Sequence, residues 1–346
     1  MNAPPPPVRV GLIGAGRIGR HHATALARHV PGANLVCVAD THRPAAHALA
    51  EALGTAAASI DALLGDEAIE AIVITAASTA HSRLIQRAAA AGKAVFCEKP
   101  MSMTLPDFDA AIASCQLAGV PLQVGFNRRF SADFVAAHEI INSGGIGKPQ
   151  LLRSLTRDPG LANPGAVPPG TIFTQTLIHD FDALLWLNPG AAVVEVHAFA
   201  DALVAPDFAA GGLLDTAIVT MRFDNGAMAT AEANFAAAYG YDVRAEAFGS
   251  AGMVTVGGPV QQSAAHWTAA GVSRRTSRSD TELMHDAYVA EFVAFCDAVR
   301  GGTPVGAGGA DAKAAFAVAL AAWRSAESGR RVSIAEVIEG GSGRLP

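Results

Sequence analysis

The segment that decides the fold of this chain is VRVGLIGAGRIGRHHATALARH, residues 8–29. A short run rich in β-branched side chains is followed by GAGRIG and then by a stretch with helical composition. Strand, glycine-rich turn and helix in this order, with Gly14, Gly16 and Gly19 spaced as G-x-G-x-x-G, predict a dinucleotide-binding unit. The first glycine permits the tight turn, the second lets the backbone approach a pyrophosphate, and the third lets helix and strand pack closely. The free N–H groups of the helix N-terminus are then expected to face the phosphates.

A second predicted strand, ANLVCVAD, ends at Asp40, which lies roughly twenty residues beyond the glycines, where an acid is expected to hydrogen-bond the adenosine ribose. Its charge should also repel a 2′-phosphate, so NAD is favoured over NADP as the cofactor. Arg43 keeps NADP as the less favoured alternative. The competing interpretation of Asp40 is a helix cap or turn residue.

The same pattern continues to residue 127. AIEAIVITA (68–76), KAVFCEKP (93–100) and VPLQVGFNRRF (120–130) are predicted strands, and helical segments separate them. Strands alternating with helices predict an α/β fold with a parallel, doubly wound Rossmann sheet. Ligands bind at the carboxyl ends of such strands, and four polar residues fall there: Asp40, Thr75, Lys99 and Asn127.

The rest of the chain has a different organisation. Five alternating segments after residue 150 predict strands, and Asp-Asn-Gly at 224–226 predicts a hairpin between two of them. Two helical segments, DAYVAEFVAFCDAVRGG and DAKAAFAVALAAWRSAESG, each end at glycine. We therefore expect a disordered Pro-rich tail over residues 1–7, a dinucleotide-binding domain over 8–127, and a second domain over 128–346.

Composition excludes several classes of protein. Of the 346 residues, 51% are hydrophobic and 16% charged, which speaks against disorder. The net charge of −6 gives a nucleic-acid partner no electrostatic support, and the basic cluster SRRTSR at 273–278 is interpreted as a solvated loop. No apolar run is long enough to span a bilayer. The four cysteines lack metal-ligand spacing, so no metal is expected. Without a secretory signal, the expected location is cytoplasmic.

The segment FTQTLIHDFD, residues 173–182, has the apolar spacing of a helix with His179 near its middle. Gln175 lies one turn before this histidine and Asp182 nearly one turn after it, so all three are expected on one helix face. An imidazole has a pKa near neutrality and suits general base catalysis. The alternative is a structural histidine at a helix edge.

These motifs together resemble a known family. GAGRIG followed by HHA, then FCEKP, GFNRRF, FTQTLIHDFD and YGYDVRAEAFGSAGMVTV (239–256) are similar to segments of the glucose-fructose oxidoreductase/inositol dehydrogenase (GFO/IDH/MocA) family, in particular its inositol 2-dehydrogenases. The resemblance implies that residues 128–346 form a substrate-binding and oligomerisation domain, an α+β domain built on a large, mostly antiparallel open sheet. It also implies a homodimer or homotetramer formed through the free face of that sheet.

The implied activity is NAD-dependent oxidation of a secondary hydroxyl of a cyclic polyol or sugar, myo-inositol or a related compound, to the ketone. His179 would accept the proton and Lys99 would polarise the reacting oxygen. In the family the bond corresponding to Lys99–Pro100 is often cis. The implied cofactor contacts are Gly14, Gly16, Arg17, Ile18, Gly19, Asp40, Arg43, Thr75, Ala76, His81, Glu98, Lys99 and Asn127. The implied substrate contacts are Arg128, Asp158, Gln175, His179 and Tyr241.

The chain departs from the family pattern at two positions. Inositol dehydrogenases usually carry Asp where this chain has Gln175, and Gly-Gly where it has Gly170-Thr171. An amide can hydrogen-bond an imidazole or a hydroxyl but cannot stabilise an imidazolium by charge, so His179 is expected to be a weaker base. Three explanations stay open: a different polyol or sugar, another carboxylate such as Asp182 or Asp158, or reduced or lost activity.

Two other functions compete with the dehydrogenase. One is an NAD-using glycosidase of the same fold. The other is a non-catalytic nucleotide-binding regulator, against which the presence of both Lys99 and His179 argues.

Overall fold

The computed structural model describes residues 5–258 and 264–340, which fall into two compact units. Within that range the first unit comprises residues 5–130 and 286–313, and the second comprises 131–258, 264–285 and 314–340. The first four residues of the Pro-rich tail expected over 1–7 lie outside the described residues. Among the helices that are described, none is long and apolar enough to cross a membrane.

The first unit is built on a six-stranded sheet in the order β3-β2-β1-β4-β5-β6, in which every neighbouring pair is parallel. The strands are β1 (Val8–Ile13), β2 (Ala33–Ala39), β3 (Ala56–Ala58), β4 (Ala71–Ile74), β5 (Ala94–Cys97) and β6 (Leu122–Val124). β4, β5 and β6 are buried along their whole length, as continuous apolar runs in a parallel sheet should be. The predicted Rossmann sheet is confirmed.

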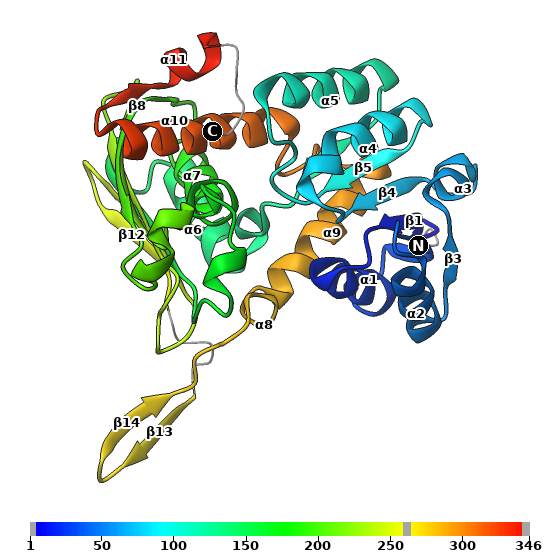
Figure 1. Ribbon diagram of the computed structural model, residues 1–346, viewed down its shortest axis with the longest axis horizontal. Helices are drawn as coiled ribbons and strands as arrows, with labels where there is room; N and C mark the ends of the chain where they lie inside the picture. Colours follow the sequence, from blue (N-terminus) through cyan, green and yellow to red (C-terminus); the bar gives the residue numbers. More distant parts are fainter. Residues whose placement is uncertain (1–4, 259–263, 341–346) are drawn as a thin grey trace. The chain divides into compact units, whose positions relative to one another are not determined.

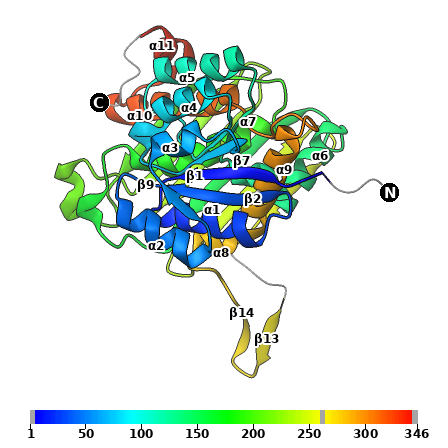
Figure 2. The same cartoon turned by 90° about the vertical axis from the view of Figure 1, so that its right-hand side faces the viewer.

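Helices cover both faces of this sheet. The helical segments of residues 5–130 are α1 (Arg17–Arg28), α2 (Arg43–Leu53), α3 (Ile60–Gly65), α4 (Ser78–Ala90), α5 (Leu105–Ala118) and the 3₁₀ turn η1 (Asn127–Phe130). In Figure 2, α1 and α2 lie on one face of β1 and β2, and α4 and α5 lie on the other. The helix ends follow from the sequence: the Thr104 hydroxyl caps α5 through the Asp107 N–H, and Gly119 ends it in a left-handed conformation.

Helix α9 (His285–Val299) belongs to the first unit by its contacts, whereas the sequence-based boundary at residue 127 assigned it to the second domain. Its Phe292 and Phe295 are fully buried in the core formed by β1, β2, α1 and α2, and the Phe292 ring lies 4.6 Å from that of Phe96. The apolar face of α9 therefore completes one side of the Rossmann core, which no local sequence pattern indicates.

The second unit is built on a seven-stranded sheet in the order β12-β11-β7-β10-β9-β8-β15. Two of its strands, β8 and β12, are labelled in Figure 1. The strands are β7 (Pro149–Arg157), β8 (Val193–Asp201), β9 (Thr216–Phe223), β10 (Met228–Asn234), β11 (Asp242–Gly249), β12 (Met253–Gly257) and β15 (Val332–Ser333). β7 and β10 pair in parallel and the other neighbours are antiparallel, so the expected mostly antiparallel sheet is confirmed. The Asp224-Asn225-Gly226 turn joins β9 to β10 as predicted.

One face of this sheet is covered by helices and the other is open. Along β9 and β10 buried and exposed side chains alternate, which is the pattern of a sheet with one solvated face. The other elements of this unit are α6 (Ala132–Asn142), η2 (Pro164–Ala166), the π-helical segment η3 (Ile172–Thr176), α7 (Leu177–Trp186), η4 (Pro206–Gly211), α8 (Asp280–Leu283) and α11 (Ile334–Glu339), with α10 (Gly309–Ser328) entering it at residue 314. α7 contacts β7 and β10, and thus lies against the middle of the sheet.

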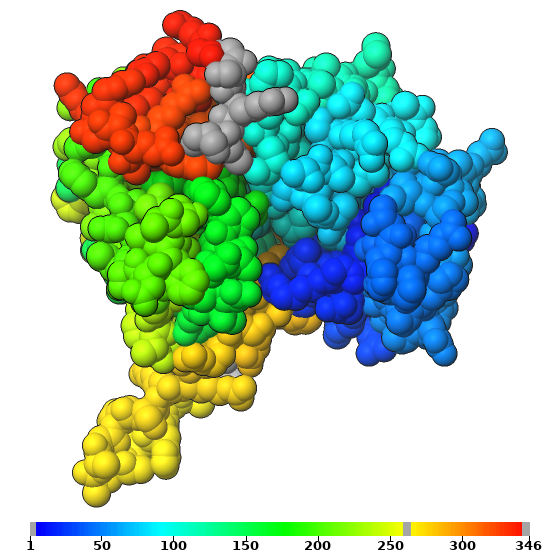
Figure 3. Space-filling view, viewed as in Figure 1, coloured from blue at the N-terminus to red at the C-terminus, as the bar shows by residue number. Residues whose placement is uncertain are grey.

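A separate hairpin, β13 (Ala265–Thr268) and β14 (Gly271–Arg274), projects from the second unit, as the space-filling view in Figure 3 shows. Its Trp267 and Val272 face each other across the strands and are largely exposed. The basic cluster at 273–278, expected as a loop, begins in β14 and continues as a loop. There Arg275 pairs with Glu282.

Candidate active site

The glycine-rich turn of the first unit is fixed by its own packing at two of its three glycines. Gly14 has φ +113°, and a Cβ placed on it would lie 2.5 Å from the Thr75 carbonyl carbon. A Cβ on Gly19 would lie 1.8 Å from the carbonyl oxygen of Gly14. The Thr75 hydroxyl donates to that same oxygen at 2.8 Å. Both glycines are therefore required by the protein itself, with or without a ligand.

Gly16 is different, because no contact among the described residues requires a glycine there. It is exposed, has an ordinary φ of −71°, and a Cβ on it would meet no atom of these residues within 4 Å. It is also the N-cap residue of α1, where the helix presents its free N–H groups. The space that a side chain would fill lies open at a helix N-terminus, which fits the close approach of a pyrophosphate.

Asp40 follows β2 and is part of the same turn. Its carboxylate accepts hydrogen bonds from the Ala15 N–H at 2.6 Å and from the His42 N–H at 2.7 Å. The turn interpretation of Asp40 therefore holds, but α2 is capped at His42 and not at Asp40. A carboxylate has about four acceptor sites, so a partly exposed Asp40 keeps capacity for a ribose hydroxyl. Arg43 begins α2 and is exposed, as are Arg17 and, in part, Ile18 in the turn.

His81 ties together the segments that follow two neighbouring strands. Its Nδ1 lies 2.9 Å from the carbonyl oxygen of Pro100, and its Nε2 lies 2.9 Å from that of Ala76. Burial, the largest influence, lowers the pKa of this imidazole, although both carbonyls and the Glu98 charge act in the opposite direction. His81 is only 1% exposed, so its ring supports the backbone after β4 and β5.

Glu98, Lys99 and Pro100 follow β5 at the carboxyl edge of the sheet. The Glu98 carboxylate accepts from His22 Nε2 at 2.6 Å and from the Lys99 backbone N–H at 3.1 Å. Burial raises the pKa of Glu98, but the hydrogen bond and charge of His22, with Lys99 and His81, hold it below its ordinary value. The Lys99–Pro100 bond is cis, and Lys99 itself is half-buried.

The GFNRRF segment, which ends the N-terminal part of the first unit, has three buried polar side chains in η1: Asn127, Arg128 and Arg129. Arg129 pairs with Asp311 at 3.2 Å and donates to the Gly306 carbonyl, so it has a structural function. Arg128 was expected in the second domain, but its contacts place it in the first unit. Of the predicted cofactor residues, Gly14, Asp40, Thr75 and Glu98 directly follow strands of this sheet, whereas Arg17, Ile18, Gly19, Arg43 and His81 lie in α1, α2 and α4.

In the second unit the predicted helix over 173–182 consists of two kinds of turn. Ile172–Thr176 is π-helical, and α7 begins at Leu177. Gln175 lies in the π segment and His179 in the first turn of α7, and both are half-buried. The prediction of one regular helix was wrong here, because a π turn holds an extra residue and alters the angular offset between positions four apart. Such turns occur frequently at functional sites.

Gly170 precedes the π segment and has φ +70°, and a Cβ on it would lie 2.1 Å from the Trp323 ring. The first glycine of the family's Gly-Gly pair is thus required by packing. At the second position, the Thr171 hydroxyl donates to the Pro168 carbonyl at 2.7 Å.

Asp180 is a residue that the sequence analysis missed. It is fully buried, and its carboxylate accepts from the Ser154 hydroxyl at 2.5 Å and from the Thr156 hydroxyl at 2.7 Å. These bonds fix α7, and with it His179, to β7. The sequence does contain two hydroxyl residues on one face of β7, Ser154 and Thr156. They indicate a partner for Asp180 only once α7 is known to pack against β7. Asp182, expected near His179, is also buried.

Asp158 and Tyr241 lie at the same end of two paired strands. Asp158 directly follows β7, Tyr241 directly precedes β11, and the neighbouring residues Arg157 and Asp242 are register partners. The structure therefore brings these two predicted substrate residues together. His179 and Gln175 come from the helical segment after β7.

The two units define a class of protein: an NAD-binding Rossmann oxidoreductase with a C-terminal sheet domain. Residues 8–126 match the model of the oxidoreductase family with an NAD-binding Rossmann fold (GFO_IDH_MocA), and residues 134–255 match the GFO/IDH/MocA C-terminal domain. The chain belongs to the GFO/IDH/MocA family, and the protein is an NAD-dependent oxidoreductase.

Its relatives cover nearly the whole chain. It is 36% identical over 342 residues to the myo-inositol 2-dehydrogenase of Thermotoga maritima, covering 96% of this chain and 100% of that protein. It is 35% identical over 337 residues to the scyllo-inositol 2-dehydrogenase (NAD(+)) of Bacillus subtilis, covering 94% and 96%. The structure of scyllo-inositol dehydrogenase from Lactobacillus casei with bound NAD(H) and scyllo-inositol matches with a TM-score of 0.90, 27% identity, and coverage of 95% and 99%.

Proposed function

We propose that this protein oxidises a secondary hydroxyl of an inositol or a related cyclic polyol or sugar to the ketone. The observation that carries the proposal is the position of Lys99. It lies at the carboxyl edge of the sheet that carries the glycine-rich turn, in a segment held by Glu98 and His81. The names of the relatives support inositol as the first substrate to test.

When it is bound, NAD is the hydride acceptor. The turn at Gly16 and the carboxylate of Asp40 would hold it. The protein must then take the hydroxyl proton. We assign that step to His179, whose imidazole suits a general base near neutral pH. The Lys99 ammonium donates a hydrogen bond to the same oxygen and stabilises its alkoxide character. His81 supports the backbone beside the cofactor through its contacts with the carbonyl oxygens of Pro100 and Ala76.

Substrate hydroxyls require several polar partners. We assign Gln175, Asp158, Tyr241 and Arg128 to them, with Gln175 as the residue that sets specificity. The amide of Gln175 can donate and accept, whereas the carboxylate usual in inositol dehydrogenases only accepts when ionised. Substrates that differ in the orientation of one hydroxyl should therefore be discriminated at this residue.

The test is NADH formation by the purified protein with NAD and a panel of inositols and aldoses. His179→Ala should lower kcat by about 10²–10⁴-fold and leave NAD affinity unchanged. The exposed His266 on β13 provides a control, since His266→Ala should leave turnover unchanged. Absence of NADH with every substrate would refute the proposal, and release of a sugar from a glycoside without NADH accumulation would point to the glycosidase.

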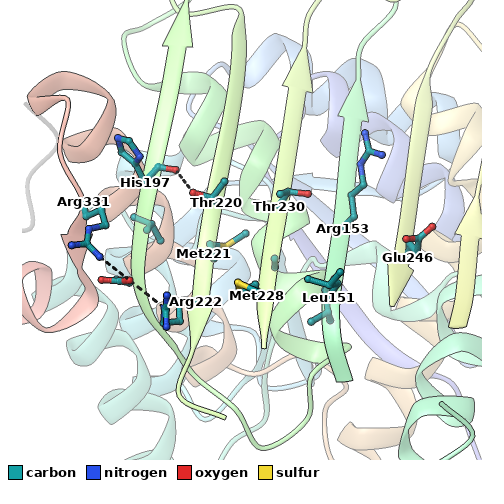
Figure 4. Close-up of a pocket in the computed structure, with 14 residues that line it drawn as sticks. Leu151, Arg153, His197, Thr220, Met221, Arg222, Met228, Thr230, Glu246 and Arg331 are labelled. Carbon is teal, nitrogen blue, oxygen red and sulfur yellow. Dashed lines mark hydrogen bonds and ion pairs between the residues drawn. The ribbon is translucent and has the colours of Figure 1, made fainter. Parts of the chain in front are cut away.

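We further propose that the open face of the second sheet binds a second copy of this chain. It exposes large apolar side chains from several strands: Leu151, Phe199, Ile218, Met228 and Phe248. A cavity of about 450 Å³ lies on this face, lined in part by Leu151 and Met228 and bordered by the Arg222–Glu195–Arg331 ion pairs (Figure 4). None of the predicted site residues lines this cavity. Apolar surface of this kind usually marks an interaction site.

Light scattering tests this interface. Ile218→Glu should reduce the oligomer mass, whereas Leu117→Glu, at a position 92% exposed on α5, should not. An unchanged mass for Ile218→Glu would refute the assignment.

The proposed cytoplasmic location is supported by the four cysteines, which are all free and buried.

A further inference from the structure

Glu291 on α9 is a buried acid with no visible partner for its charge. Its side chain is fully buried, and neither carboxyl oxygen has a hydrogen-bond partner among the described residues. Gln123 Nε2 donates at 2.8 Å to the backbone carbonyl of Glu291 and not to its carboxyl group. An isolated ionised carboxylate in such a place is very costly, so the carboxyl group needs a proton or a cation.

Glu291 is part of a cluster with His22 on α1 and Glu98 at the end of β5. One ligand atom from each residue lies within 4.8 Å of the others, and all three side chains are buried. Aromatic rings border the cluster: the His22 ring lies 4.9 Å from Phe292 and 5.2 Å from Tyr288. All three residues belong to the first unit, so the cluster lies within one body.

The hydrogen bonds favour a proton over a metal ion. His22 Nε2 and Glu98 Oε1 are 2.6 Å apart and are engaged with each other, and the other Glu98 oxygen accepts the Lys99 N–H. Burial, reinforced by the Glu98 charge, raises the pKa of Glu291 well above its ordinary value. The pKa of Glu98 is held low by His22, Lys99 and His81 in spite of its burial. The pKa values of the two neighbouring carboxyl groups, Glu98 and Glu291, are thus shifted in opposite directions.

We propose that His22 and Glu291 are positioning residues for Lys99. His22 holds Glu98 as the anion, and Glu291 stands beside it as the neutral acid. The single negative charge of the cluster then fixes the Lys99 backbone N–H. If Glu291 were also ionised, its charge would repel that of Glu98 and weaken this arrangement. The catalytic consequence rests on the proposed function, because it assumes that Lys99 contacts the reacting oxygen.

The chain allows a direct test, because it contains only four lysines, Lys93, Lys99, Lys148 and Lys313. In protein labelled with ¹⁵N-lysine, four backbone amide signals are expected, and Lys99→Arg identifies that of Lys99. Glu98→Gln removes the anion and should move the Lys99 signal while leaving the other three in place. Glu291→Ala should move it as well, and Glu291→Gln, which mimics the neutral acid, should restore it.

The turnover number of each variant should change in parallel with its Lys99 amide signal. Glu98→Gln and Glu291→Ala should lower kcat about tenfold with little change in KM, and Glu291→Gln should recover most of the loss. The infrared carbonyl band of a protonated carboxylic acid should be present in the unaltered protein and absent from Glu291→Gln. If Glu291→Ala does not fold, the glutamine variants and the infrared band decide the question.

Three results would overturn the inference: a Lys99 signal unmoved in Glu98→Gln, a signal moved as far in Glu291→Gln as in Glu98→Gln, or one divalent metal ion per chain in the purified protein. The amide and infrared measurements need no substrate. They therefore distinguish failure of this inference from failure of the proposed function, which would appear as absent NADH formation.

Discussion

The hydroxyl of Thr156 on β7 donates a 2.7 Å hydrogen bond to the buried carboxylate of Asp180 on α7. Ser154 donates to the other oxygen of the same group, so two strand residues hold the helix that carries His179. The position of the proposed base, His179, thus depends on Ser154 and Thr156, which are not among the proposed substrate contacts.

Thr156→Val should lower the free energy of unfolding by about 1–3 kcal/mol, because it leaves a buried carboxylate oxygen without its donor. Urea denaturation measures the change. Thr255→Val on β12, where the side chain is exposed, is the matched control and should stay within about 0.5 kcal/mol. Equal effects of the two substitutions would contradict the function assigned to Thr156.

Gly16→Ala and Gly19→Ala should separate cofactor binding from folding. The Gly16 methyl group enters open space, so stability should change by less than about 0.5 kcal/mol while NAD affinity falls. The Gly19 methyl group meets the Gly14 carbonyl oxygen, so stability should fall by about 1–3 kcal/mol or more. Thermal unfolding and NAD titration measure both quantities. Unchanged NAD affinity in Gly16→Ala would show that the pyrophosphate does not approach this turn.

Gln175→Asp should make the proposed base stronger. A carboxylate near His179 favours the imidazolium, so the acid limb of the kcat/KM profile should move to higher pH by about one unit. Gln175→Asn shortens the side chain equally without adding charge and is the control. If the asparagine variant moves the acid limb as far as the aspartate variant, charge is not the cause.

His81 should make stability depend on pH. Its folded-state pKa is lowered by burial, so the unfolded chain takes up the proton first as the pH falls. The stabilisation is complete above the unfolded pKa of about 6.5 and is lost below it, by at most about 1.4 kcal/mol per pH unit. His81→Gln should flatten this part of the stability curve. His266→Gln, at an exposed position, should leave it unchanged, and a curve equally steep in His81→Gln would refute the assignment.

The local parts of this structure were predictable from the sequence. Gly14 and Gly19 indicate the first turn, because packing admits no side chain at either position and Gly14 also has a positive φ. The strand ends near Asp40, Thr75 and Lys99 follow from the alternation of strands and helices. The hairpin at Gly226 follows from a three-residue pattern.

What could not be predicted depends on contacts between distant segments. Glu291 looks like an ordinary acid on an amphipathic helix until α9 is seen to pack on the Rossmann core. Asp180 gains its function only from its position opposite Thr156. The π turn at Ile172–Thr176 shares its apolar spacing with an ordinary helix, so periodicity cannot distinguish them.

The assignment of α9 to the first unit also has a consequence for synthesis on the ribosome. All six strands of the Rossmann sheet have been made by residue 124, but Phe292 and Phe295 belong to the core beside them. The growing chain therefore carries an unfinished apolar surface while the whole second sheet, except its edge strand β15, is being translated. Nascent chains that stop before α9 should be recognised by chaperones, and those that extend past Val299 should be released from them.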